Sequence, residues 1–130
     1  MGKGSGTRSG LLWEFERIMK ELTDLKERPE VLLMENVPQV HGLDNWGDFN
    51  AWQTSLEEMG YRSYWADLSA DDFGIPQTRN RCFMVSLLGD YSYSFPEKQP
   101  LKLRLRDLLE NKVDRKYFLT EKQKARIIWK

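Results

Sequence analysis

Two short polar stretches of the sequence contain residue types that acid–base and anion-binding chemistry needs. In the first, the apolar run VLLM ends on a carboxylate and an amide, Glu35 and Asn36. Burial of an unpaired carboxylate costs several kcal/mol, so Glu35 needs either a partner or a chemical role. Ligands of open α/β sheets bind beyond the carboxyl ends of the strands, and Glu35 occupies such an end. The alternative is a structural carboxylate that caps a helix or pairs with an arginine.

The second stretch is GIPQTRNR, just before another apolar run. Side chains two residues apart on a strand share a face, which predicts that Gln77, Arg79 and Arg81 project together. An arginine keeps its charge, so a partly buried one needs an anion or a hydrogen-bond acceptor opposite it. A solvated strand end is the alternative. Cys82 then points to the opposite face and precedes apolar residues, which favours a core thiol over a nucleophile.

The elements that position these stretches follow from the spacing of the apolar residues. We expect two helices and three strands, at residues 11–25, 30–37, 49–59, 61–69 and 81–88. Pro29 prevents the first helix from continuing, and Gly60 closes the second. The strand at 30–37 is apolar throughout, which is typical of strands covered by helices on both faces. The order helix, strand, helix, strand, strand predicts an α/β layer arrangement.

Composition narrows the class of protein further. A chain of 130 residues is long enough for one domain with its own core. The single cysteine and the single histidine, His41, exclude an internal disulfide, a Cys-rich zinc site and a histidine cluster, so metal catalysis is not expected. No apolar run has the length of a membrane span and no signal peptide is present, which predicts a soluble, cytoplasmic protein.

The pattern changes after Asp90. A proline-punctuated linker at 91–100 precedes an expected short amphipathic helix at 103–112, and Thr120 with Gln123 predicts a capping box for a last helix. Residues 101–130 hold ten basic and four acidic residues, which leaves ten basic and sixteen acidic ones in the first hundred, since the chain has twenty of each. The C-terminal segment is therefore basic and the body acidic.

Three segments, in order and at fitting spacing, resemble conserved blocks of the cytosine-5 DNA methyltransferases. TRSGLLWEFERI resembles the fifth block, LLMENV the sixth and GIPQTRNR the eighth. The resemblance implies a partial Rossmann-like methyltransferase fold with a short helical C-terminal extension. It also implies that residues 1–95 are part of the catalytic domain and that 96–130 are a basic linker and the start of a target-recognition region.

The resemblance implies a reaction as well. These enzymes flip a cytosine out of double-stranded DNA, add a cysteine thiolate to carbon 6, and transfer a methyl group from S-adenosylmethionine to carbon 5. Glu35 matches the proton donor at the ring nitrogen, in low-dielectric surroundings that keep it protonated. Arg81 matches the residue that contacts the carbonyl oxygen of the base, and Arg79 a second arginine of the same site. The resemblance also implies a bacterial or phage-like protein of a restriction–modification system.

Three further roles are implied at matching positions. Gln77 orients the turn, Asn36 ties the catalytic loop to the sheet, and Leu11 lines the adenosine pocket. The chain has no Pro-Cys nucleophile motif and no glycine-rich cofactor loop, so it reads as a middle piece of the enzyme, inactive alone. A complementary methyltransferase half, or a second copy that covers the incomplete sheet, is then an expected partner. The alternatives are a catalytically dead DNA-binding or interaction module and an α/β domain without activity.

Overall fold

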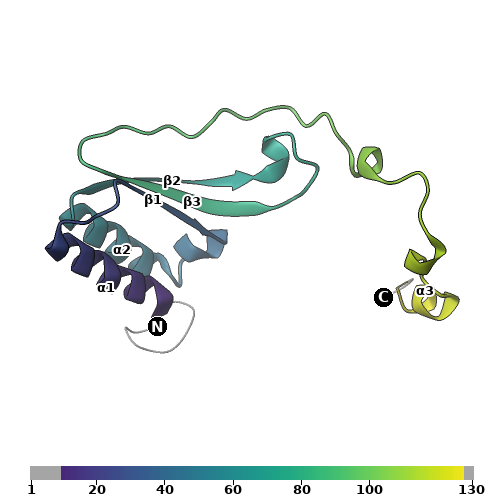
Figure 1. The fold of residues 1–130 in the computed structure, drawn as a ribbon, viewed down its shortest axis with the longest axis horizontal. Helices are drawn as coiled ribbons and strands as arrows, with labels where there is room; N and C mark the ends of the chain where they lie inside the picture. The colour runs from purple at the N-terminus through teal and green to yellow at the C-terminus, as the bar shows by residue number, and fades with distance from the viewer. Residues whose placement is uncertain (1–9, 128–130) are drawn as a thin grey trace.

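The computed structural model describes residues 10–127 of the chain, and Figure 1 shows their arrangement. Its helices and strands are α1 (Gly10–Leu25), β1 (Val31–Asn36), α2 (Trp46–Glu58), β2 (Tyr61–Ser69), β3 (Asn80–Leu88) and α3 (Glu121–Ile127). Short 3-10 helices lie between them, at η1 (Pro38–His41), η2 (Ala70–Asp72), η3 (Leu105–Leu108) and η4 (Arg115–Tyr117). The predicted α/β order is confirmed. Within residues 10–127 no helix has the length and apolar character to cross a bilayer.

α1 ends before it reaches Pro29. Lys26 has a φ of 59°, in the left-handed region. The amide of Lys26 donates to the carbonyl of Thr23 at 3.1 Å. The amide of Glu27 donates to the carbonyl of Leu22 at 3.0 Å. This pair of bonds is a Schellman motif, which satisfies carbonyls at the helix end. The left-handed residue therefore ends the helix, and the proline lies beyond its end.

The three strands form one sheet in the order β1-β3-β2. β3 lies between the other two and runs antiparallel to both. β1 and β2 therefore finish at the edge of the sheet where β3 begins. This topology brings the end of β1, with its carboxylate, next to the start of β3, with its arginines.

Both α1 and α2 lie on the same side of the sheet (Figure 1). Between these helices and the sheet lies one core cluster of buried side chains, which consists of Met19, Phe49, Trp52, Leu56, Met59, Tyr61, Cys82 and Met84. Cys82 is fully buried in this cluster. The prediction of a core thiol is therefore confirmed.

The prediction that β1 is covered on both faces is wrong for the described residues. Leu32 and Met34 pack against the core, whereas the side chains of Val31 and Leu33 are 58% and 69% exposed. Successive strand residues point to opposite faces, so the exposed pair marks the face that the helices leave uncovered. Four consecutive apolar residues indicated a buried strand, but β1 is an edge strand here and its second face has no covering layer.

The C-terminal segment extends away from the sheet (Figure 1), and every residue from 101 to 127 is exposed. The amphipathic helix predicted at 103–112 is wrong, because only the short η3 forms there. A short helix is marginal in water unless its apolar face packs on a core, and no core lies beneath this segment. The predicted capping box is confirmed: the Thr120 amide donates to Gln123 Oε1 at 2.9 Å, and the Gln123 amide donates to Thr120 Oγ1 at 3.4 Å.

Candidate active site

Glu35, Arg79 and Arg81 meet on the side of the sheet opposite the helices. Glu35 stands opposite Phe83 in the register of β1 and β3, and Arg81 lies two residues before Phe83, so their side chains share that face. Oε1 of Glu35 lies 3.0 Å from Nε of Arg81 and 3.6 Å from Nη2 of Arg79. The strand ends thus place one carboxylate between two guanidinium groups.

These three side chains line a cavity of about 290 Å³. Its other walls are mostly apolar and consist of Leu68, Ser69, Ala70, Phe73, Ile75, Phe83 and Pro96. Apolar walls with a few convergent polar groups are typical of sites that bind small organic ligands. A planar ring with a polar edge suits this arrangement, because the walls contact its faces while the charged groups meet its edge.

The turn between β2 and β3 builds one side of the cavity. The Ala70 amide donates to the Arg79 carbonyl at 3.1 Å, and the Ile75 amide donates to the Ala70 carbonyl at 3.2 Å. Gly74 permits the tight return of the chain because its φ is 80°, a value that other residues rarely adopt. The turn thereby presents Phe73 and Ile75 as walls and holds the backbone of Arg79. Sequence reasoning missed both walls, although Phe73 directly precedes the GIPQTRNR stretch and Ile75 lies within it.

The linker after β3 closes another side. Lys98 Nζ lies 2.8 Å from a carboxylate oxygen of Asp72, and the Gln99 amide donates to the Asp72 carbonyl at 2.7 Å. These contacts hold the linker against η2, where Pro96 reaches the cavity. The segment that joins the sheet to the basic region is therefore part of the site.

Glu35 is not in the low-dielectric surroundings that we expected. Its side chain is 45% exposed, and its described partners are the two arginines. An arginine-paired carboxylate, the alternative raised from the sequence, is the arrangement that these residues adopt. The Arg81 side chain is only 23% exposed, and its Nη1 also donates to the carbonyl of Asn80 at 2.7 Å. One carboxylate and two guanidinium groups leave the trio with an excess positive charge, which suits an acceptor-rich ligand edge.

The prediction that Gln77 projects together with Arg79 and Arg81 is wrong. β3 begins at Asn80, so Gln77 precedes the strand and the two-residue alternation does not extend to it. Its side chain is exposed and is not among the cavity walls. The backbone amide of Gln77 donates to the Ile75 carbonyl at 2.7 Å, which makes it part of the turn. Its implied role in orienting that turn stays a prediction.

Cys82 faces the core and not the cavity. Burial, with a smaller contribution from the Asp67 carboxylate, raises the pKa of Cys82 to about 11. A reactive cysteine needs a lowered pKa and access to its substrate. Cys82 meets neither requirement, so it does not act as the nucleophile of this site.

A model of the family described as C-5 cytosine-specific DNA methylase matches residues 2–128. The chain belongs to this family. The type II methyltransferase M2.ScrFI of Lactococcus lactis subsp. cremoris is 43% identical to this methylase chain over 120 residues, which are 92% of the chain and 32% of the relative. The orphan methyltransferase M.SssI of Spiroplasma monobiae is 39% identical over 136 residues, covering 97% of the chain and 34% of the relative. The methylase chain thus spans about a third of the length of these relatives.

Solved structures support the fold of the methylase chain. The Dnmt2 methyltransferase of S. pombe matches with a TM-score of 0.70 at 21% identity, covering 95% of this chain and 42% of that one. The methyltransferase EhMeth of Entamoeba histolytica matches with a TM-score of 0.64 at 20% identity, covering 84% and 33%. The predicted partial Rossmann-like methyltransferase fold is therefore confirmed.

The roles that the methylase resemblance assigns to Asn36 and Leu11 remain predictions. Oδ1 of Asn36 accepts a hydrogen bond from the Val37 amide at 2.8 Å, a local contact at the end of β1. Its role in tying a catalytic loop to the sheet stays a prediction. Leu11 lies in α1, but its side chain is outside the described residues, so the adenosine contact also stays a prediction.

Proposed function

We propose that this chain supplies the base-binding part of a DNA (cytosine-5-)-methyltransferase, whose substrate is a cytosine turned out of double-stranded DNA. One observation carries the proposal: in a chain of the methylase family, the Glu35 carboxylate and the Arg81 guanidinium lie 3.0 Å apart on one cavity with apolar walls. Enzymes that modify a base inside a duplex extrude it into such a pocket.

Each polar group of the cavity has a complementary group on cytosine. Addition of a thiolate to carbon 6 pushes electron density toward the ring nitrogen, so a proton donor there lowers the barrier. The protonated Glu35 carboxyl donates to that nitrogen, while its other oxygen accepts from the exocyclic amine. Arg81 donates to the carbonyl oxygen of the base, and Arg79 keeps the acid in place.

The exposure of Glu35 fits this proposal if the base itself completes the site. An entering cytosine displaces water from the carboxyl and takes over the guanidinium of Arg81. Loss of water and of a cationic neighbour both disfavour a charged carboxylate and favour the protonated carboxyl of Glu35. The acid is therefore protonated in the complex, where the proton is needed.

The nucleophile and most of the methyl-donor site belong, in this proposal, to another part of the enzyme. S-adenosylmethionine, the methyl donor of the family, carries a sulfonium cation, which would face the positive charge of Arg79 and Arg81 in this cavity. The cavity therefore does not fit the cofactor, and Leu11 is the one contact that we assign to it in these 130 residues. We expect no methyl transfer from this chain alone and restored transfer with a complementary half.

A chimeric enzyme tests the assignment. The chain replaces its counterpart in M2.ScrFI, to which it is 43% identical, and methylation of DNA is measured for the chimera and for the chain alone. We expect activity only in the chimera, and a large loss in Arg81→Ala. Arg62→Ala is the matched control, because Arg62 pairs with Asp90 at 2.6 Å and is not among the cavity walls. Full activity of a chimera with Arg81→Ala contradicts the proposal.

A second candidate function is a catalytically silent DNA-binding module. The exposed basic segment favours it, with Lys102, Arg104, Arg106, Lys112, Arg115, Lys116, Lys122, Lys124 and Arg126 all open to solvent. Binding through phosphates weakens steeply with salt, with a slope of about 0.9 per phosphate contact in a double-logarithmic plot. If the chain alone binds duplex DNA in this way and the chimera does not methylate, the second candidate replaces the first.

The uncovered face of β1 supports the proposed need for a partner. Val31 and Leu33 expose apolar side chains on an edge strand, the kind of surface that pairs with another chain. A complementary methyltransferase half or a second copy of this chain covers it in our proposal. Leu33→Asp should reduce any self-association that size-exclusion chromatography detects for the unaltered chain. An unchanged elution profile in that variant places the contact elsewhere.

A further inference from the structure

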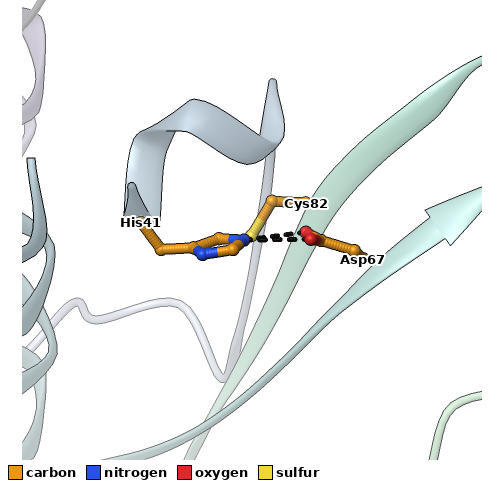
Figure 2. A group of neighbouring side chains, drawn as sticks. All are labelled: His41, Asp67 and Cys82. Carbon is orange, nitrogen blue, oxygen red and sulfur yellow. Dashed lines mark hydrogen bonds and ion pairs between the residues drawn. The ribbon is translucent and has the colours of Figure 1, made fainter. Parts of the chain in front are cut away.

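The only histidine and the only cysteine of the chain lie beside a carboxylate on the helix-covered side of the sheet. His41 is the last residue of η1, Asp67 lies on β2 and Cys82 on β3, and Figure 2 shows their polar atoms turned toward one another. Asp67 and Cys82 stand opposite each other on the paired strands β2 and β3. His41, which lies 26 residues before Asp67 in the sequence, contacts the Asp67 carboxylate. Side chains of three types from three elements thus converge on one point that the cavity of Glu35 does not use.

We propose that His41, Asp67 and Cys82 bind one thiophilic divalent cation of the zinc class. Thiolate sulfur, imidazole nitrogen and carboxylate oxygen are the three ligand types that Zn²⁺ takes from proteins. A mixed set of this kind is not visible in a search for cysteine-rich or histidine-rich spacing, which is why the sequence did not indicate it.

The distances between the ligand atoms suit a single ion after small adjustments. One atom from each residue lies within 4.8 Å of the others. With Zn–N bonds of about 2.0 Å and Zn–S bonds of about 2.3 Å, ligands around one tetrahedral ion lie roughly 3.3 to 3.7 Å apart. Nε2 of His41 is 2.9 Å from Oδ1 and 3.1 Å from Oδ2 of Asp67, so an ion between them needs only a slight separation. Side-chain rotation of His41 and Asp67 toward the sulfur supplies the remaining change.

The three proposed ligands differ in their exposure to solvent. The Cys82 thiol is fixed in the core, whereas the side chains of His41 and Asp67 are 20% and 33% exposed. The imidazole also packs on the ring of Trp65, with centroids 4.7 Å apart. An ion would therefore take the thiolate from the core side and the other two ligands from the solvent side. Its fourth position would hold water.

Binding of the divalent cation leaves the site without net charge. The ion replaces the thiol proton of Cys82, which leaves to solvent. It also takes the Nε2 position of His41, so the single proton of the neutral imidazole lies on Nδ1 in the complex. The thiolate and the carboxylate then neutralise the two charges of the cation, while the imidazole stays neutral. Because only Val37 separates η1 from the end of β1, the ion would tie the exit of β1 to β2 and β3. The proposal does not depend on methyl transfer.

Titration of the complete chain with Co²⁺ tests the site. Tetrahedral Co²⁺ gives visible d–d bands, and a cobalt–thiolate bond gives a near-ultraviolet charge-transfer band. Because the chain has one cysteine, the charge-transfer band can come only from Cys82. We expect one equivalent of Co²⁺ to give both signals, and Zn²⁺ to abolish them by displacement and to raise the Tm.

Variants separate this site from adventitious binding. Cys82→Ser should lose the charge-transfer band, and His41→Asn should weaken Co²⁺ binding by more than the roughly 10- to 100-fold typical of losing an outer-shell partner. Asp44→Asn is the control, since it removes an exposed carboxylate three residues from His41 and should change neither signal. If circular dichroism shows that Cys82→Ser does not fold, His41→Asn and Asp67→Asn, at partly exposed positions, decide the question.

Two results overturn the proposal. One is a folded chain that gives no cobalt–thiolate band at saturating Co²⁺, which would leave His41 and Asp67 as a hydrogen-bonded pair without an ion. The other is unchanged Zn²⁺ affinity in His41→Asn and Asp67→Asn, which would place the ion on other surface groups.

Discussion

Replacement of Glu35 by glutamine should reduce the rate of methyl transfer far more than the stability of the fold, so one substitution distinguishes a chemical role from a structural one. The side chain of Glu35 is 45% exposed, so its ion pairs with Arg79 and Arg81 are partly solvated. Ion pairs of this kind contribute about 0 to 1 kcal/mol to stability. Glutamine keeps the shape and one oxygen acceptor. We therefore expect the free energy of unfolding to change by about 1 kcal/mol or less.

The expected effect on methyl transfer is much larger. An amide donates a hydrogen bond to the ring nitrogen but does not give up a proton, and loss of general acid catalysis typically costs about 10²- to 10⁴-fold in rate. At about 1.4 kcal/mol per factor of ten, this loss corresponds to roughly 3 to 5 kcal/mol of transition-state stabilisation. DNA affinity should stay nearly unchanged, because the proton matters mainly in the transition state.

The assay uses the chimera with M2.ScrFI and a radiolabelled methyl donor, with DNA affinity and thermal unfolding measured on the same samples. Asp90→Asn is the matched control: it also converts an arginine-paired carboxylate to an amide, at a side chain that is 85% exposed. A Glu35→Gln chimera with the unaltered rate refutes the proton-donor role. A loss of DNA affinity as large as the loss of rate would instead assign Glu35 to binding.

Three further predictions concern stability. Lys26→Gly should raise the free energy of unfolding by about 1 kcal/mol, because glycine adopts the left-handed conformation of Lys26, φ 59°, without steric cost; a loss of stability in urea unfolding would contradict this. Leu56→Ala should lower it by about 2 to 5 kcal/mol because Leu56 is fully buried, whereas Leu43→Ala, at a 99% exposed side chain, should change it by less than about 0.5 kcal/mol. The free energy of unfolding should also fall as pH rises from about 8.5, where a free thiol ionises, to about 11, because the raised pKa keeps Cys82 protonated only in the folded chain. Cys82→Ser should remove that part of the pH dependence, and an unchanged slope would show that other groups cause it.

The helices and strands up to residue 88 and the candidate chemistry could be predicted from local patterns in the amino-acid sequence. Apolar spacing predicted two helices and three strands close to their observed bounds, because the period of a helix or strand is a local property of the chain. The acid at the end of β1 and the arginines before β3 were recognisable for the same reason, since strand ends and motif spacing are read over a few residues. The methylase family followed from these motifs, and the comparison with known proteins confirmed it.

The arrangement of these parts in space became visible only in the folded chain. The tertiary structure placed β3 between β1 and β2, left one face of β1 uncovered, and removed Gln77 from the group of the arginines. It also left residues 103–112 without a helix and brought His41, Asp67 and Cys82 to one point. Burial and strand pairing depend on contacts between residues far apart in the chain, and a local pattern does not specify which partner fills the other side of a strand or helix.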